Sequence, residues 1–222
     1  MTLDDLDALM AQRFSCRAFR PDPVPRETIE QIVAAARRVP SWCNAQPWQV
    51  TLTSGEETDR FRAAMIEEAR TGSHDPDLPF PTGYSGACRE RRRTCGWQLY
   101  EAVGVEKGDR AGSARQRMEN FALFGAPHCA IVTSPAELGA YGALDCGGFV
   151  TAFTLAAQAA GVASIPQAAV ASHAPFLHRW FDIPEDRLVL CAISFGYADP
   201  DHPANGFRTD RVGLDEIIDW RG

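Results

Sequence analysis

Residues 143–160 constrain the fold most, because this stretch has the composition of a helix yet is apolar on almost every side. Small residues dominate it, and Gly161 follows as a residue that commonly ends a helix. A helix without a polar face must be buried. Either a protein core or an interface between subunits would bury this one.

The other periodicities predict helices arranged around a sheet. Apolar residues recur at helical spacing in residues 3–12, 26–39, 56–70, 89–103 and 109–123, and 214–220 is expected to form one last turn. Short apolar runs predict strands at 48–53, 129–133 and 188–195. Because the helices outnumber the strands and the strands lie far apart in sequence, we expect a central sheet flanked by helices in an α+β or α/β layout.

Composition bounds the class of protein. A chain of 222 residues with 45% hydrophobic content suits a single well-packed domain, here residues 1–222. The net charge of −7 argues against nucleic-acid and anionic membrane partners. No apolar run approaches the roughly 20 residues that span a bilayer, and the acidic N-terminus does not resemble a signal peptide. The seven cysteines form no Cys-x-x-Cys pair, so we expect a cytoplasmic location.

Two arginine pairs are candidates for binding an anion. Arg13, Ser15 and Arg17 alternate directly after the first predicted helix, and alternate side chains of an extended segment share one face. Arg208 and Arg211 lie in an irregular, glycine-containing tail. Guanidinium groups suit phosphate or the polar edge of a heterocycle. Surface arginines beside a helix end and a solvated charged tail are the alternative interpretations.

The stretch RRVPSWCNAQPWQV, residues 37–50, is crowded with flat and hydrogen-bonding groups. Ser41 and Asn44 offer donors and acceptors, and Trp42 offers a flat apolar surface, a mixture that suits a planar ring with a polar edge. Trp48 is expected in the core. Cys43 has no histidine near it in sequence, so a buried, inert thiol is expected rather than a nucleophile.

Residues 161–169 form a further candidate, because their small side chains would let a ligand approach the backbone. We expect Pro166 to interrupt regular strand pairing there, and a plain helix-to-strand connector is the alternative. The five histidines show no metal-ligand spacing, and no glycine-rich phosphate loop or nucleophile elbow is present. We therefore expect no metal site.

Together these stretches resemble the FMN-dependent nitroreductases in order and spacing. The most specific element is Pro40-Ser41-x-x-Asn44-x-Gln46-Pro47-Trp48, and the resemblance covers nearly the whole chain. Further similarity to the nitrobenzoate and nitrobenzene reductase branch lies in Arg91-Arg92-Arg93, Leu99-Tyr100, Asn120-Phe121, the FGAP at 124–127, Asp145-x-Gly147 and the tail FGYADPDHPANGFRTDR.

The resemblance implies an α+β fold with a central, mostly antiparallel sheet in an intertwined homodimer. It also implies two FMN sites, each built from both chains. One chain would hold the phosphate, ribityl chain and pyrimidine edge through Arg13, Ser15, Arg17, Arg208 and Arg211. The partner chain would line the ring with Pro40, Ser41, Trp42 and Asn44. The segment along the ring, with a backbone N–H near the flavin N5, would be Pro166, Gln167, Ala168 and Ala169.

The implied activity is reduction of a small nitroaromatic substrate to the hydroxylamine, by ping-pong hydride transfer through flavin N5 from NADH or NADPH. It requires no side-chain acid, and Arg17 is the candidate for stabilising negative charge on the flavin. The segment 71–86, with Phe80 and Tyr84, is expected to form a lid over the acceptor or else a disordered surface loop. Residues 89–93 would attract a carboxylated substrate or form a solvated helix face.

Several alternatives stay open at this level. The same flavin pocket would serve a dehydrogenase or oxidase, an ene-reductase or a dehalogenase. A non-catalytic flavin-binding protein and a cysteine enzyme using Cys43 belong to other classes. Some members of the family carry Glu-Gly where this chain has Ala168 and Ala169, and an asparagine after the third helix whose equivalent the sequence does not place. The physiological acceptor and the nicotinamide preference are likewise left open.

Overall fold

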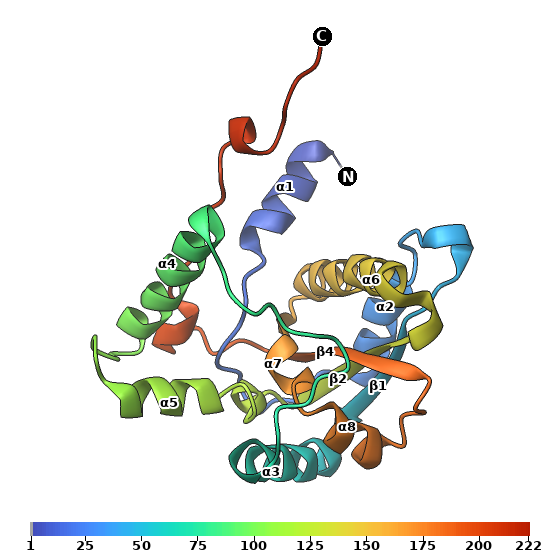
Figure 1. The fold of residues 1–222 in the computed structure, drawn as a ribbon, viewed down its shortest axis with the longest axis vertical. Coiled ribbons are helices and arrows are strands. Elements are labelled where there is room, and N and C mark those ends of the chain that lie inside the picture. Colours follow the sequence, from blue (N-terminus) through green and yellow to red (C-terminus); the bar gives the residue numbers. More distant parts are fainter. Residues whose placement is uncertain (1) are drawn as a thin grey trace.

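The computed structural model describes residues 2–222. They form one four-stranded antiparallel sheet with helices around it (Figure 1). Its strands are β1 (Gln49–Ser54), β2 (His128–Pro135), β3 (Ala163–Gln167) and β4 (Arg187–Gly196), in the order β1-β2-β4-β3. The three predicted strands are confirmed, as is the α+β layout.

Strand β3 corrects the prediction for residues 161–169. We expected Pro166 to interrupt regular pairing, but the antiparallel register with β4 runs through it and places Pro166 opposite Ile193. Proline lacks an N–H and is tolerated in a sheet mainly on an edge strand. Because β3 forms the edge of this sheet, the missing donor does not break the ladder.

The helices largely follow the predicted periodicities. They are α1 (Leu3–Gln12), α2 (Arg26–Ala36), α3 (Glu56–Thr71), α4 (Gly86–Ala102), α5 (Arg110–Met118), α6 (Gly139–Ala159), α7 (Ala168–Ala171) and α8 (Ala174–Phe181). Short 3-10 turns cover Trp42–Asn44, Leu123–Gly125, Ala136–Leu138, Pro203–Asn205 and Leu214–Glu216. The predicted helix at 109–123 was too long: α5 ends at Met118, turns follow it, and the positive φ angles of 55° and 53° at Leu123 and Phe124 exclude a helix there.

Helices cover both faces of the sheet (Figure 1). On one face, Phe153 of α6 packs with Ile32 of α2 and makes an edge contact with Phe195 of β4 at a centroid distance of 5.4 Å. On the other face, Phe61 of α3 and Leu177 of α8 belong to a second cluster. Within residues 2–222, no helix is both long and apolar enough to cross a membrane.

Helix α6 is buried on one side only within the single chain. Phe149 and Cys146 face the sheet, whereas Leu144 on the opposite side is 69% exposed. Trp42, 63% exposed, packs against Tyr141 of α6 at a ring distance of 5.0 Å. Exposed apolar groups also mark the C-terminal tail, which extends away from the body of the protein (Figure 1). The exposed aromatic and aliphatic groups of Trp42, Tyr141 and Leu144 indicate an interaction site on this side of α6.

The 72–85 loop, which joins α3 to α4, is anchored to the body of the protein by polar contacts. The Asp75 N–H donates to the Ser172 carbonyl at 2.8 Å. The Asp77 carboxylate accepts from the Val189 N–H at 2.6 Å and lies 2.9 Å from His178 Nε2. Asp77 therefore ties the loop to both β4 and α8.

His178 faces an acceptor on each side of its ring. Its Nδ1 lies 3.0 Å from the Ile183 carbonyl, and its Nε2 faces Asp77. Both nitrogens can donate only in the imidazolium form. Burial by itself lowers the pKa of His178, but the Ile183 carbonyl, Asp77 and the more distant Glu185 together outweigh it and raise the pKa above its ordinary value.

We predict that His178→Gln destabilises the protein most at low pH. A raised folded-state pKa contributes stability that is fully present below the ordinary histidine value of about 6.5 and is lost as pH rises through the folded value. Urea unfolding at about pH 5.5 should show a loss of about 1 kcal/mol, and the loss should shrink by about pH 8.5. His74→Gln, on the same loop, is the control. A loss that is constant or grows with pH would contradict the imidazolium assignment.

Candidate functional site

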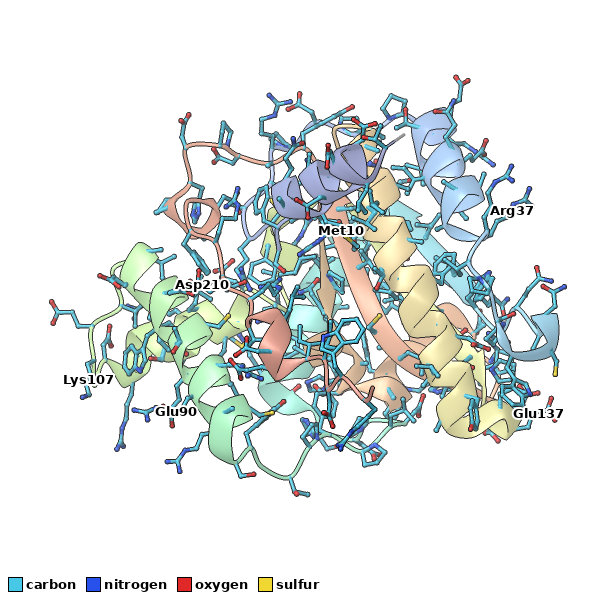
Figure 2. The ribbon with its side chains drawn as sticks, turned by 90° about the horizontal axis from the view of Figure 1, so that it is seen from above. Met10, Arg37, Glu90, Lys107, Glu137 and Asp210 are labelled. Carbon is cyan, nitrogen blue, oxygen red and sulfur yellow. The ribbon has the colours of Figure 1, made fainter. Side chains whose placement is uncertain are left out.

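The two arginine pairs meet at one cavity of about 220 Å³. The segment after α1 forms one wall, and the Cys16 N–H fixes it to β3 by donating to the Ser164 carbonyl at 3.2 Å. The C-terminal tail forms another wall; Figure 2 labels Met10 of α1, which lines the cavity, and Asp210 of the tail, which lies between the lining residues Thr209 and Arg211 in sequence. The lining residues are Met10, Ala11, Arg13, Phe14, Ser15, Arg17, Cys95, Phe207, Arg208, Thr209 and Arg211.

The cavity is strongly electropositive. Four of its lining residues are arginines, and within the described part of the chain no acidic side chain lines it. Burial and the nearby charge of Arg211 both lower the pKa of Arg13, and burial lowers the pKa of Arg17. A depressed guanidinium pKa means that the cation lacks compensation. An anion such as phosphate would supply that compensation.

Aromatic rings orient two of the guanidinium groups. Arg208 lies over the Phe14 ring at 4.0 Å from the ring centroid, and Arg17 lies over Phe207 at 5.6 Å. Stacking occupies the faces of these planar groups, while phosphate and carboxylate are bound at their N–H edges. Sequence reasoning missed both phenylalanines, because nothing in the chain order shows that residues 14 and 207 are neighbours.

Asn205 joins the two walls and was not assigned from sequence. Its Oδ1 accepts from the Arg17 N–H at 2.8 Å, and its Nδ2 donates to the Ala18 carbonyl at 2.9 Å and to the Asp199 carbonyl at 2.8 Å. The side chain is 6% exposed. Asn205 therefore holds the tail that carries Arg208 against the segment that carries Arg17.

The 40–46 segment takes no part in the arginine cavity of its own chain. Of the residues that the structure describes, none from this segment lines the arginine cavity. Cys43, Asn44 and Gln46 adopt positive φ angles of 50°, 58° and 48°. The Trp42 N–H donates to Asp145 of α6 at 3.0 Å, and Ser41 Oγ accepts from the Gln46 N–H at 2.9 Å. A single chain thus does not bring Pro40, Ser41, Trp42 and Asn44 to the arginines.

Two expectations for this stretch had different outcomes. Trp48 is partly buried, packs against the core and stacks on Phe149 at 5.5 Å. Cys43 was expected to be buried but is exposed, because the left-handed backbone at this turn directs it outward.

The end of β3 presents two accessible residues. Pro166 and Ala168 are exposed, whereas Gln167 between them is 2% exposed. The Gln167 amide donates to the Asn120 carbonyl at 2.7 Å and accepts from the Ser194 hydroxyl at 2.5 Å. Its side chain is therefore committed to the interior, and the accessible surface at this end of β3 comes from Pro166 and Ala168.

The structure separates the two candidate substrate residues. Phe80 lines a second cavity, of about 150 Å³, together with Ala168. Tyr84 does not line it, is 49% exposed and lies under the Arg92 guanidinium at 5.3 Å. Elsewhere in 89–93, Arg91 pairs with Glu216 at 2.6 Å and Arg93 pairs with Glu90 at 3.2 Å, as a solvated helix face would. Among residues 2–222, no group of three or more potential ligands could hold a metal ion.

Comparison with known proteins identifies the class. Residues 10–197 match the model of the nitroreductase family. The chain is 36% identical to nitroreductase NfnB of Mycolicibacterium smegmatis, over 95% of this chain and 90% of that protein. It is 33% identical to a 4-nitrobenzoate reductase of Pseudomonas putida, over 94% and 92% of the two chains.

The fold agrees with this result. The crystal structure of FMN-dependent nitroreductase NfnB from Mycobacterium smegmatis, in complex with NADPH, superposes with a TM-score of 0.94 at 34% identity and covers 99% of both chains. The chain therefore belongs to the nitroreductase family.

We predict that inorganic phosphate stabilises the cofactor-free protein through the arginine cavity. Relieving the repulsion between Arg13 and Arg211 should raise the melting temperature by about 3–6 °C, corresponding to about 1–2 kcal/mol. Thermal unfolding would be compared in phosphate and in chloride at equal ionic strength. Arg211→Gln should reduce the effect, and Arg37→Gln, outside the cavity, should preserve it. An equal response in all three proteins would contradict an anion site here.

Proposed function

We propose that the protein is an FMN-dependent NAD(P)H nitroreductase that reduces nitroaromatic compounds, built as a single FMN-binding domain. The observation that carries this proposal is the arginine-lined cavity at one end of β3. Membership of the nitroreductase family and similarity to FMN-dependent and NADPH-dependent relatives support it.

The residues present suit FMN in chemistry and in spacing. Four arginines, Ser15 and Thr209 form a donor set for a phosphate group and a polar ring edge. Strand β3 leads away from the cavity, from Ser164 beside Ser15 to Gln167, a distance of about 10 Å at 3.3 Å per residue, and Ala168 follows directly as the first residue of α7. An elongated cofactor would thus place its phosphate among the arginines and its ring beside Pro166 and Ala168.

Each residue then has a distinct role. Arg13, Ser15, Arg208 and Arg211 bind the phosphate and ribityl chain. Arg17 lies deeper and is partly desolvated, so its charge stabilises negative charge at the polar edge of the ring. The backbone of 166–169 borders the ring, and no side chain is assigned as a catalytic acid. Bound FMN would supply the redox chemistry, carrying two electrons at a time from NADH or NADPH to the acceptor, so that two cycles reduce a nitro group to the hydroxylamine.

The site is completed by a second copy of the chain in a homodimer. Support comes from the exposed apolar face of α6, the exposed Trp42 beside it and the apolar tail, in which Trp220 is 85% exposed. In the dimer, Pro40, Ser41, Trp42 and Asn44 of one chain line the flavin ring bound by the other chain. The enzyme acts in the cytoplasm, without nucleic-acid or membrane partners.

We predict that the purified protein is yellow and that NADH or NADPH, added without oxygen, bleaches its flavin absorbance. Nitrobenzene should then restore the absorbance. Arg17→Gln should weaken FMN binding by about tenfold or more, because a charged hydrogen bond is lost, whereas Arg37→Gln should not. Flavin fluorescence titration measures the affinity. A protein that takes up no FMN would refute the proposal, and bleaching without recovery would refute the acceptor class.

We also predict that two defective chains complement each other in a mixed dimer. If each site uses Arg17 from one chain and Trp42 from the other, a dimer of Arg17→Gln with Trp42→Ala holds one intact site and one doubly altered site. Co-expression with two affinity tags would isolate it. Flavin titration should then show one site of wild-type affinity per mixed dimer. If neither site of the mixed dimer keeps the wild-type affinity, each site belongs to a single chain.

A further inference from the structure

The second cavity lies between the 72–85 loop and the body of the protein. Residues 76 and 78–81 form its outer wall, and Ala168, Ala171, Val189 and Leu190 form its inner wall. We refer to it as the loop pocket. Its volume is about 150 Å³. This volume is about that of an apolar cavity that admits a benzene ring.

The loop pocket is uncharged. None of its described lining residues carries a charged side chain, and the polar groups in its walls are backbone groups. Asp77 lies between two lining residues in sequence, but its carboxylate is bonded to His178 and the Val189 N–H. The one acidic group within the outer wall is thus compensated, and the same contacts fix the loop in place over the pocket.

The loop pocket shares Ala168 with the ring end of the proposed flavin site. Ala168 follows directly after β3, which leads from the arginine cavity, and it also lines the inner wall of the pocket. The nearby arginine side chains place no positive charge in the pocket. Arg92 stacks on Tyr84, which is outside the lining, and Arg91 is paired with Glu216.

We propose that the loop pocket is the acceptor subsite and that it selects neutral nitroaromatic compounds over carboxylated ones. This inference rests on the proposed function and names its substrate class. The nitro group of the acceptor faces the flavin, and a para methyl or halogen substituent occupies the loop pocket. A carboxylate in the same place would lose water without gaining a donor, which is strongly unfavourable. The protein therefore differs in preference from a relative named 4-nitrobenzoate reductase.

The first experiment uses the FMN-loaded wild-type protein and two ligands that cannot be reduced. Fluorine NMR would compare the binding of 4-fluorotoluene and 4-fluorobenzoate. We expect binding of 4-fluorotoluene only. In turnover, kcat/KM for 4-nitrotoluene should exceed that for 4-nitrobenzoate by about tenfold or more.

Leu78→Arg places a cation in the loop pocket and should reverse the preference, so that 4-fluorobenzoate binds and 4-nitrobenzoate becomes the better acceptor. Leu52→Arg is the matched control, because Leu52 is 42% exposed on the edge strand β1 and lies outside the pocket. It should keep the wild-type preference.

Equal binding of the two fluorinated ligands by the wild-type protein, or preference for the benzoate, would overturn the inference whether or not Leu78→Arg folds. So would a folded Leu78→Arg protein with unchanged preference. Reduction of bound FMN by NADPH provides the separate test of the proposed function. If that reduction occurs normally while the acceptor preference is absent, only the inference on the loop pocket fails.

Discussion

The site depends on the contact between the segment that follows α1 and the edge strand β3. Ser15 forms a bridge with Ser164, and the Cys16 N–H donates to the same residue. This backbone pairing places two arginines near the start of β3, and Ala168 follows directly after the far end of that strand. Because hydrogen-bonding groups of an edge strand are open to further pairing, a short loop can bind there without its own secondary structure. The arginine cavity and the loop pocket thus lie at the two ends of one rigid element.

Two side-chain contacts complete this frame from distant parts of the chain. Asn205 fixes the C-terminal tail to residues 17 and 18, so that arginines from both ends of the sequence converge. Asp77 fixes the 72–85 loop to α8 and β4. Both contacts pair a polar group with partners that are partly or fully buried, where hydrogen bonds are more costly to lose than at the surface. A single polar side chain thus helps to fix each of the two segments that border the arginine cavity and the loop pocket.

Sequence reasoning identified the arginine pairs, the long apolar helix and three of the strands, because periodicity and residue chemistry are local properties. It failed at β3, where Pro166 suggested an interruption that an edge strand does not suffer, and at α7, which is too short to show a period. It could not find Asn205, Phe14 or the Asp77–His178 contact, since these pairings join residues far apart in the chain. The 40–46 segment was identified by its composition. Within one chain it does not line the arginine cavity, and in the proposed dimer the second subunit would supply it.

The most direct test of the account is a crystal structure of the protein with FMN bound. We predict that the phosphate lies among Arg13, Arg208 and Arg211, that the ring borders Pro166 and Ala168, and that Trp42 of a second copy lies beside the ring. A flavin bound in another place, or a ring that does not reach Ala168, would contradict the assignment of the arginine cavity and of the loop pocket together.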